Sequence, residues 1–407
     1  MAELHLREYR GTGKVVSELG STVECDFVLR QSSSGKRTLS CTTSDPSALR
    51  ISEDNEKKRP LRCRFDGLVS QPSARVVASQ TCLANSTYKM EQGRPETFGL
   101  ELLPLEPVEI EYQQVSVDQK VEYRIGLSNL VFLGTHSIAK HAGKSPSRID
   151  VRIAEQDIFL ESSDWYYDLT KRLEDGPGID VTAHLVTTDL LGNRSLVRQI
   201  CNDLCVLLSF ATCNWISPLY EDCFLDGQRI VTTLLPAKTF RYNPGERVID
   251  AREGNELKEY LETTYPNYIR LKDALGMNIV MEYFVHSRLM NLFEIKYLIA
   301  AIGMECLKSH LPDYFAAKCK TVDVTSFRSS LRELFRDIPM PYQQSELDFI
   351  EVRDKIVHTG KFPPNVECVE EYQKLLNLCD RTTLTVLGYR GKPYLNSTKG
   401  YTKEPVP

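Results

Sequence analysis

Apolar and polar residues alternate with a period of two over most of the chain before residue 190. Turn-forming segments such as QSSSGKR, DGPG and GKSPSR separate the alternating runs. Short runs of this period are typical of strands with one buried face, and the frequent turns favour antiparallel pairing. The pattern predicts an antiparallel β-rich domain over residues 1–190, either a sandwich or a barrel.

The period changes near residue 190. Ser195 is suited to cap a helix over residues 196–213, whose apolar residues have helical spacing. Prolines then exclude a long helix from the mixed stretch that follows. We expect residues 191–254 to form a linking helix and a hairpin or extended arm.

From residue 255 the chain has helical spacing. We expect an amphipathic segment interrupted at Pro266, a long apolar segment over residues 277–311, and a helix capped by Thr325. Two more helices follow, over residues 346–360 and 366–389. The predicted fold class is therefore α+β.

The helical part, residues 255–396, is expected to be an all-α up-and-down bundle, followed by a tail over residues 397–407.

The segment ELDFIEVRDKIVHTGK, residues 346–361, is apolar on two sides when drawn as a helix of about 100° per residue. One side carries Phe349, Val352 and Ile356. The nearly opposite side carries Leu347, Ile350 and Val357. Only Glu351 and Lys355 are left for solvent, so the helix is expected to lie between two protein surfaces. A second copy of the chain is the natural candidate for the outer one.

Arg353, Asp354 and His358 are interleaved with that second apolar group. Guanidinium matches the geometry of a phosphate, and imidazole moves protons near neutral pH. With the 2′-hydroxyl of RNA as nucleophile, these groups are sufficient for cleavage without metal. The alternative is structural: His358 interacts with the helix dipole, and Arg353 pairs with Asp354 or a glutamate.

Three segments resemble a known family, the HEPN domains, and in particular their Apea-like branch. RDKIVHTG matches the family's Arg-x4–6-His pattern at the end of a bundle helix. KYLIAAIGMECL carries Glu305 where such domains often have an acidic residue, and LTVLGYRGKPYLN is similar to the Leu-Gly-Tyr-x-Gly-x-Tyr ending of the branch. The β-rich part fits the two-part plan of this branch more loosely.

The resemblance implies a metal-independent endoribonuclease that acts as a homodimer in the cytoplasm, as a toxin or as an effector of antiviral defence or abortive infection. Arg353 would contact the scissile phosphate and His358 would be the acid/base group. Asp354, the third candidate catalytic residue, stands where the family often has asparagine, and its carboxylate would either orient Arg353 or partly neutralise it. The products would carry 2′,3′-cyclic phosphate and 5′-hydroxyl ends.

Other residues acquire expected roles from the same resemblance. Lys355, Lys361 and Arg390 are candidates for RNA binding, and Glu305 is a supporting acidic residue. Leu347, Ile350 and Val357 would form the dimer interface. No cofactor is implied.

Two other interpretations remain open. The bundle is a non-catalytic HEPN module in one of them, and binds RNA, nucleotide or a partner protein. In the other, the β-rich domain senses a foreign protein or nucleic acid, and the bundle only dimerises. A sensing or antitoxin protein is a candidate partner.

Composition narrows the class of protein. The 407 residues have a formal net charge of −5, which argues against a protein that coats nucleic acid through bulk charge. We find no signal peptide, no run long enough to span a bilayer and no CxxC pair among the 12 cysteines. We therefore expect a soluble cytoplasmic protein with mostly buried thiols and no metal site.

One glycine-rich segment resembles a phosphate-binding loop only superficially. Gly11-Thr-Gly13-Lys14 lacks the leading glycine, because Glu8 stands there, and Val15 replaces the required hydroxyl. We expect a turn before the first strand.

Overall fold

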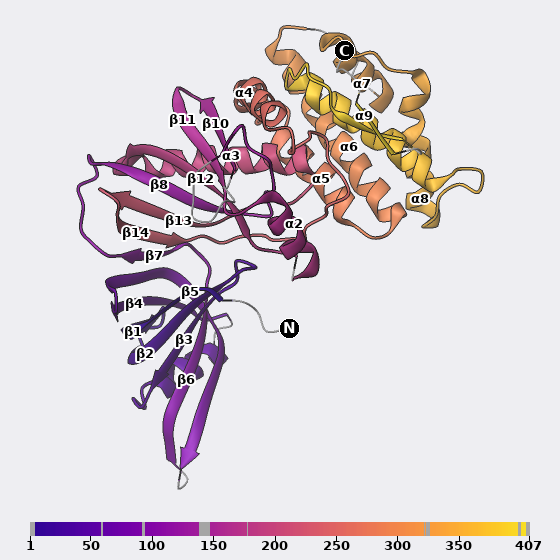
Figure 1. The fold of residues 1–407 in the computed structure, drawn as a ribbon. Helices are drawn as coiled ribbons and strands as arrows, with labels where there is room; N and C mark the ends of the chain where they lie inside the picture. The colour runs from indigo at the N-terminus through magenta and orange to yellow at the C-terminus, as the bar shows by residue number, and fades with distance from the viewer. Residues whose placement is uncertain are drawn as a thin grey trace. The chain divides into compact units, whose positions relative to one another are not determined.

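The computed structural model has an α+β fold, with a large antiparallel sheet in the N-terminal half and helices in the C-terminal region (Figure 1). It describes residues 5–57, 60–91, 94–137, 147–176, 178–320, 322, 326–397 and 400–403. The predicted α+β class and the antiparallel pairing are thereby confirmed.

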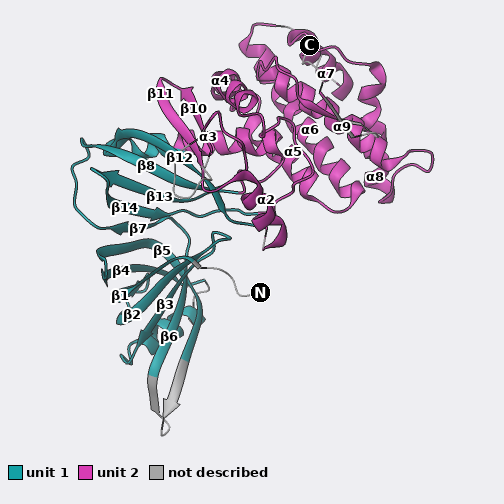
Figure 2. Ribbon diagram, in the orientation of Figure 1, with its two compact units in different colours: residues 1–128, 179–198, 217–239 teal, residues 129–178, 199–216, 240–407 magenta. Residues whose placement is uncertain are grey.

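The chain divides into two compact units that interleave in sequence (Figure 2). Unit 1 comprises residues 1–128, 179–198 and 217–239. Unit 2 comprises residues 129–178, 199–216 and 240–407. The sequence pattern had instead suggested contiguous parts with boundaries near residues 190 and 254.

Unit 1 begins with a closed β-barrel. Its strands are β1 (His5–Ser17), β2 (Thr22–Ser32), β3 (Arg37–Thr43), β4 (Arg62–Ser70), β5 (Ser73–Glu91) and β6 (Arg94–Pro104), and α1 (Ala48–Lys57) connects β3 to β4. They pair in the order β4-β1-β2-β3-β6-β5, and β5 pairs with β4 to close the ring. Apolar residues at alternating positions fill the interior, where the Phe27 and Phe65 rings pack edge to face at 4.8 Å. Of the two predicted architectures, the barrel is therefore the one that these strands form.

Glycines in β1 allow the barrel to close. A Cβ atom on Gly11 would lie 1.9 Å from the backbone oxygen of Leu68, and one on Gly13 would lie 2.4 Å from the Phe65 ring. Both glycines lie inside β1 and pair with β2 and β4. The prediction of a turn before the first strand was wrong, because these glycines serve close packing between strands.

The sheet of unit 1 continues from the barrel strand β5 in the order β5-β7-β14-β13-β8-β12. Its further strands are β7 (Val108–Glu111), β8 (Lys120–Ser128), β12 (Val181–Leu190), β13 (Pro218–Leu225) and β14 (Gln228–Leu234). The hairpin expected between residues 191 and 254 is β13–β14, and it is inserted between β7 and β8.

The linking helix is α3 (Arg194–Thr212), which follows the short 3₁₀ helix η1 (Leu191–Asn193). Ser195 had been predicted as the N-cap. That prediction was wrong, because Ser195 lies inside the helix. The 3₁₀ turn starts the helix earlier than the apolar spacing indicated.

Among the described residues of unit 2, the strands before its first helix are β9 (His136–Ser137), β10 (Ser147–Ile153) and β11 (Gln156–Ser162). Its helices are α2 (Tyr166–Asp175), α4 (Gly254–Leu271), α5 (Met277–Leu289), α6 (Phe293–Ala317), α7 (Phe327–Asp337), α8 (Phe349–Thr359) and α9 (Cys368–Val386). The hairpin β15 (Tyr394–Ser397) and β16 (Gly400–Lys403) follows α9 and occupies part of the predicted tail.

The helix boundaries differ from the predicted ones at several prolines and caps. Pro266 lies within a continuous α4, because the ring is exposed and water can bind the carbonyl that it leaves unpaired. The long apolar segment over residues 277–311 is divided into α5 and α6. Ser326, with Ser329, forms the capping box of α7. The predicted cap, Thr325, lies outside the described residues.

A buried ion pair joins α5 to α9 in unit 2. Arg288 donates to both carboxylate oxygens of Asp380 at 2.6 and 2.7 Å, and both side chains are 1% exposed. Such a pair fixes the register of the two helices, because neither charge tolerates the loss of its partner.

Candidate functional site

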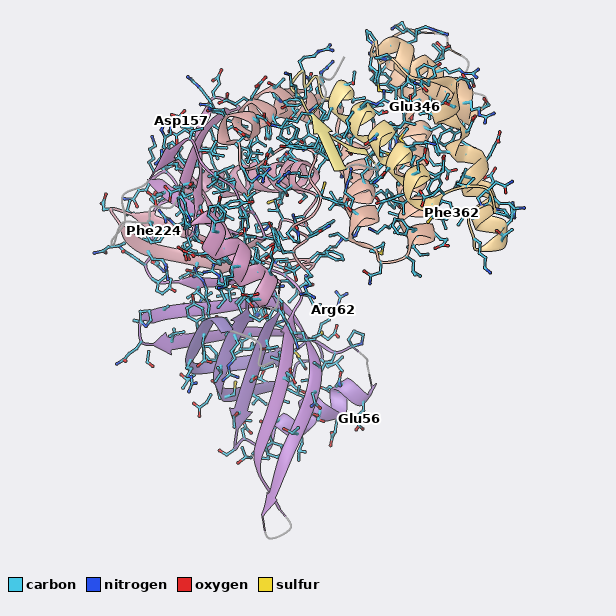
Figure 3. All side chains as sticks on the ribbon, turned by 45° about the vertical axis from the view of Figure 1, so that its right-hand side comes forward. Glu56, Arg62, Asp157, Phe224, Glu346 and Phe362 are labelled. Atoms are coloured by element: carbon cyan, nitrogen blue, oxygen red, sulfur yellow. The ribbon has the colours of Figure 1, made fainter. Side chains whose placement is uncertain are left out.

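The predicted helix over residues 346–360 is two elements. The 3₁₀ helix η2 (Gln344–Asp348) comes first, and α8 follows it directly. Glu346 in η2 and Phe362 just after α8 are labelled in Figure 3. Gly360 ends α8 in the left-handed region at φ 70°, as the sequence predicted.

The inner face of α8 packs into unit 2. Its apolar residues Phe349, Val352 and Ile356 are buried, as expected. Tyr297 of α6 donates a hydrogen bond to the backbone carbonyl of Phe349 at 3.2 Å, which fixes the first turn of α8 against α6. Sequence reasoning missed Tyr297, since nothing along the chain links it to α8.

The outer face of α8 is less apolar than predicted. Leu347 was expected on it, but this residue lies in η2 and is fully buried. The angle count failed because a 3₁₀ turn has three residues, so residues before α8 are rotated away from the α-helical register. Ile350 is half-buried, and Val357 is 57% exposed. Asp354 and His358 share this exposed face.

Arg353 lies at the edge between the inner and outer faces, with 26% of its side chain exposed. It forms an ion pair with Glu305 of α6 and donates to the Asp354 carboxylate at 2.5 Å. The structure thus brings Glu305, Arg353 and Asp354 together. Two carboxylates hold one guanidinium, which orients it and lowers its net charge.

His358 lies in the last turn of α8 and is exposed. A protonated imidazole there interacts favourably with the C-terminal end of the helix dipole. At about 100° per residue, His358 and Arg353 leave the helix axis about 140° apart. The two side chains of one protomer therefore point in different directions.

The candidate RNA-binding cations are exposed. Lys355 and Lys361 are both exposed near the C-terminal end of α8. Thr359 links them, because its hydroxyl donates to the Lys355 carbonyl at 2.7 Å and accepts from the Lys361 amide at 3.3 Å. Arg390 is exposed in the segment that follows α9.

The tail segment that resembles the Apea-like ending has structural contacts. Tyr389 is buried against the Tyr260 ring at 5.6 Å. The Tyr394 hydroxyl donates to the Asp250 carboxylate at 2.8 Å, and Arg252 donates to the same carboxylate. The aromatic residues of this motif therefore anchor the chain after α9.

The carboxylate of Asp250 is expected to stabilise the fold in a way that is lost in acid. Burial alone raises the pKa of Asp250, but the hydrogen bonds from Arg252 and Tyr394 outweigh it and lower the pKa to about 2. The resulting stability, about 2 kcal/mol, is present above the unfolded-state pKa of about 4 and is lost as the pH falls through about 2. We expect Asp250→Asn to be destabilised by that amount at neutral pH, and by about half of it at pH 3.

The measurement is urea unfolding followed by tryptophan fluorescence. Trp165 and Trp215, the 2 tryptophans of the chain, both belong to unit 2. Asp273→Asn, at an exposed position, serves as the control and should match the wild type. A difference between Asp250→Asn and wild type that does not change with pH would contradict this assignment.

A cavity of about 400 Å³ lies beside the inner face of α8, where Phe349 and Val352 line it together with Glu346 and Lys374. Neither Arg353 nor His358 lines it. Arg353 is partly exposed and His358 is exposed, so solvent reaches both side chains.

Other features bear on the class of protein. Within the described residues, no group of three or more His, Cys, Asp or Glu side chains is arranged to hold a metal ion. No helix among the described residues has the length and apolarity to cross a membrane. The cysteines are free thiols and most are buried, as expected.

Comparison with known proteins does not assign a family. No family model, no curated protein and no solved structure matches this chain.

Proposed function

We propose that the protein is a metal-independent endoribonuclease of HEPN type, with Arg353 and His358 of α8 as its catalytic groups. The observation that supports this most directly is the ion pair from Glu305 to Arg353. It joins two of the segments that resemble HEPN domains, and it holds a guanidinium partly exposed beside the exposed outer face of α8.

The reaction requires only these groups and the RNA. The 2′-hydroxyl forms a bond to the adjacent phosphorus, and the bond from phosphorus to the 5′-oxygen breaks. Imidazole takes the proton of the 2′-hydroxyl, and imidazolium supplies one to the leaving 5′-oxygen. Arg353 stabilises the charge that collects on the phosphorane oxygens. The products are a 2′,3′-cyclic phosphate and a 5′-hydroxyl.

A second copy of the chain would complete the site. Arg353 and His358 diverge by about 140° on one helix, so a single protomer does not direct both at one phosphate. If the outer faces of two α8 helices meet, each phosphate can contact the arginine of one protomer and the histidine of the other. Ile350 and Val357 would supply the apolar part of that contact.

One observation favours the non-catalytic alternative. Glu305 and Asp354 both bind Arg353, so its charge is largely compensated before any phosphate arrives. A module that binds RNA, nucleotide or a partner protein, with the β-rich part as the sensing region, is the second candidate.

The chemical groups at the ends of cleaved RNA test the proposal. Single-stranded RNA labelled at its 5′ end is incubated with the full chain in excess chelator, beside the double variant Arg353→Ala/His358→Ala. We expect cleavage by the wild type alone, with 2′,3′-cyclic phosphate ends. Cleavage that requires a divalent ion, or that the double variant retains, would rule out this mechanism. A wild type that binds the RNA but leaves it intact would support the non-catalytic candidate.

Val357→Asp tests the composite site. A charge on the outer face of α8 is expected to convert a dimer into a monomer and to abolish cleavage. Molar mass is measured by light scattering after size-exclusion chromatography. Ile279→Asp on α5, where the isoleucine is 45% exposed, is the matched control and should leave mass and cleavage unchanged. An active monomeric Val357→Asp variant would contradict the two-copy site.

A further inference from the structure

Unit 1 contains a cavity of about 730 Å³ on one face of the sheet β12-β8-β13-β14. Phe224, labelled in Figure 3, is one of its lining residues. The volume is in the range of small-molecule sites and is far larger than a single inorganic ion needs. All of the lining residues belong to unit 1.

The cavity is on the sheet face that α3 does not cover. Side chains alternate along β13, so Glu221 and Cys223 point to one face, and Tyr220, Asp222 and Phe224 to the other. Arg194 and Arg198 of α3 bind Glu221 on the first face. Polar side chains on a solvated sheet surface are usually mobile. Several side chains on the second face are instead held by contacts with neighbouring strands.

Tyr220 forms a fixed floor. Its ring lies across Gly126 of β8, where a Cβ atom would be 2.5 Å from the ring. The hydroxyl is 2.9 Å from Nε2 of His184 on β12. Because only glycine leaves room for this ring, strands β12, β8 and β13 together determine where Tyr220 lies.

Arg7 of β1 covers the other side of Tyr220. Its guanidinium lies 3.8 Å from the ring centroid and donates to both carboxylate oxygens of Asp222, at 2.9 and 2.7 Å. The Thr232 hydroxyl also donates to Asp222 at 2.6 Å. Asp222 is 3% exposed, so its charge is satisfied within the protein and does not repel an anion in the cavity.

Basic side chains line the open part of the cavity. Arg229 is 42% exposed and 3.4 Å from Asp222, which is longer than a strong charged hydrogen bond, and its guanidinium lies 5.6 Å from the centroid of the Phe224 ring. Arg124 of β8 also lines the cavity. Lys120 is exposed at the start of β8. The exposed side chains of Lys120 and Arg229 can therefore turn toward a ligand phosphate at little cost.

Carboxylates accompany these cations. Glu122 and Asp226 also line the cavity. They are exposed and would repel a bare polyanion, but they accept hydrogen bonds from hydroxyl groups. A ligand that satisfies both sets carries phosphate and hydroxyls on one small molecule.

We propose that this cavity binds a nucleotide, with its phosphates at Lys120, Arg124 and Arg229 and its ribose hydroxyls at Glu122 and Asp226. This site belongs to unit 1 and does not depend on the function proposed for α8.

Isothermal titration calorimetry of the full chain at low salt tests the proposal, with ATP, AMP, tripolyphosphate and citrate as probes. We expect ATP to bind more tightly than tripolyphosphate and citrate. Arg229→Glu and Lys120→Glu should each lower ATP affinity at least about tenfold. Arg64→Glu, on the exposed surface of β4, is the charge-matched control and should retain binding.

Glu122→Gln separates ribose recognition from charge. It should weaken binding of ATP while leaving that of tripolyphosphate equal or stronger. Absence of ATP and AMP binding at millimolar concentration would overturn the proposal. So would binding of tripolyphosphate as tight as that of ATP, or an equal loss in Arg64→Glu. Because Lys120, Glu122 and Arg64 are exposed, circular dichroism of their variants should show wild-type melting. Lys120→Glu carries the test if Arg229→Glu, which places a second carboxylate beside the buried Asp222, melts at a lower temperature.

Discussion

His358→Ala is expected to lower the rate of RNA cleavage by about 10²- to 10⁴-fold, which is the usual contribution of a positioned acid/base group. Arg353→Ala should lower it by about 10²- to 10³-fold, because the phosphorane loses its principal source of positive charge. Single-turnover cleavage of labelled RNA in excess chelator measures both effects. His136→Ala and Arg270→Ala remove exposed groups of the same kinds elsewhere in unit 2 and should cleave at the wild-type rate.

Asp354→Asn is expected to raise the rate of RNA cleavage, whereas His358→Ala and Arg353→Ala lower it. The Asp354 side chain is 52% exposed, so its ion pair with Arg353 is worth at most about 1 kcal/mol, and its removal should raise the rate by at most about fivefold. A large loss of activity in Asp354→Asn would instead give this carboxylate a positive role in the reaction. If all these variants cleaved RNA at the wild-type rate, α8 would contribute no group to the reaction.

Asp380→Ala is expected to lower the free energy of unfolding of unit 2 by about 3 to 5 kcal/mol. The substitution leaves the Arg288 guanidinium buried between α5 and α9 without its carboxylate, and Glu246, 3.5 Å from Arg288, offers only a longer contact. Urea unfolding followed by tryptophan fluorescence reports the loss, since both tryptophans are in unit 2.

A double variant distinguishes lost charge pairing from lost packing. Arg288→Met/Asp380→Leu removes both charges at similar volume and should recover most of the stability. Asp348→Ala breaks the exposed Arg328–Asp348 pair and should cost less than about 1 kcal/mol. If the double variant were as unstable as Asp380→Ala, packing rather than the unpaired charge would be the cause.

The sequence pattern was informative wherever one periodic segment decided the outcome. Alternation predicted the antiparallel β-rich character of the N-terminal half, and helical spacing predicted the buried residues Phe349, Val352 and Ile356. It failed for Leu347, because a 3₁₀ turn changes the angle per residue. It also failed for Gly11, whose role depends on a neighbouring strand that is distant in sequence.

The sequence predicted residues of the candidate site on α8, but not how they contact other helices. The residues on α8 were visible as a local pattern, and the resemblance pointed to Glu305. That Glu305 contacts Arg353 required the packing of α6 against α8. The cavity of unit 1 had no local signal, because β1, β8, β12, β13 and β14 each contribute only a few residues to it.

The interleaving of the two units limits how the protein can be taken apart. The polypeptide passes between them near residues 128, 178, 198, 216 and 239. A single cut near residue 239 separates residues 240–407, which carry α4 to α9, but residues 129–178 and 199–216 of unit 2 stay with the other fragment. A gene fusion with one junction therefore cannot transplant unit 2 whole.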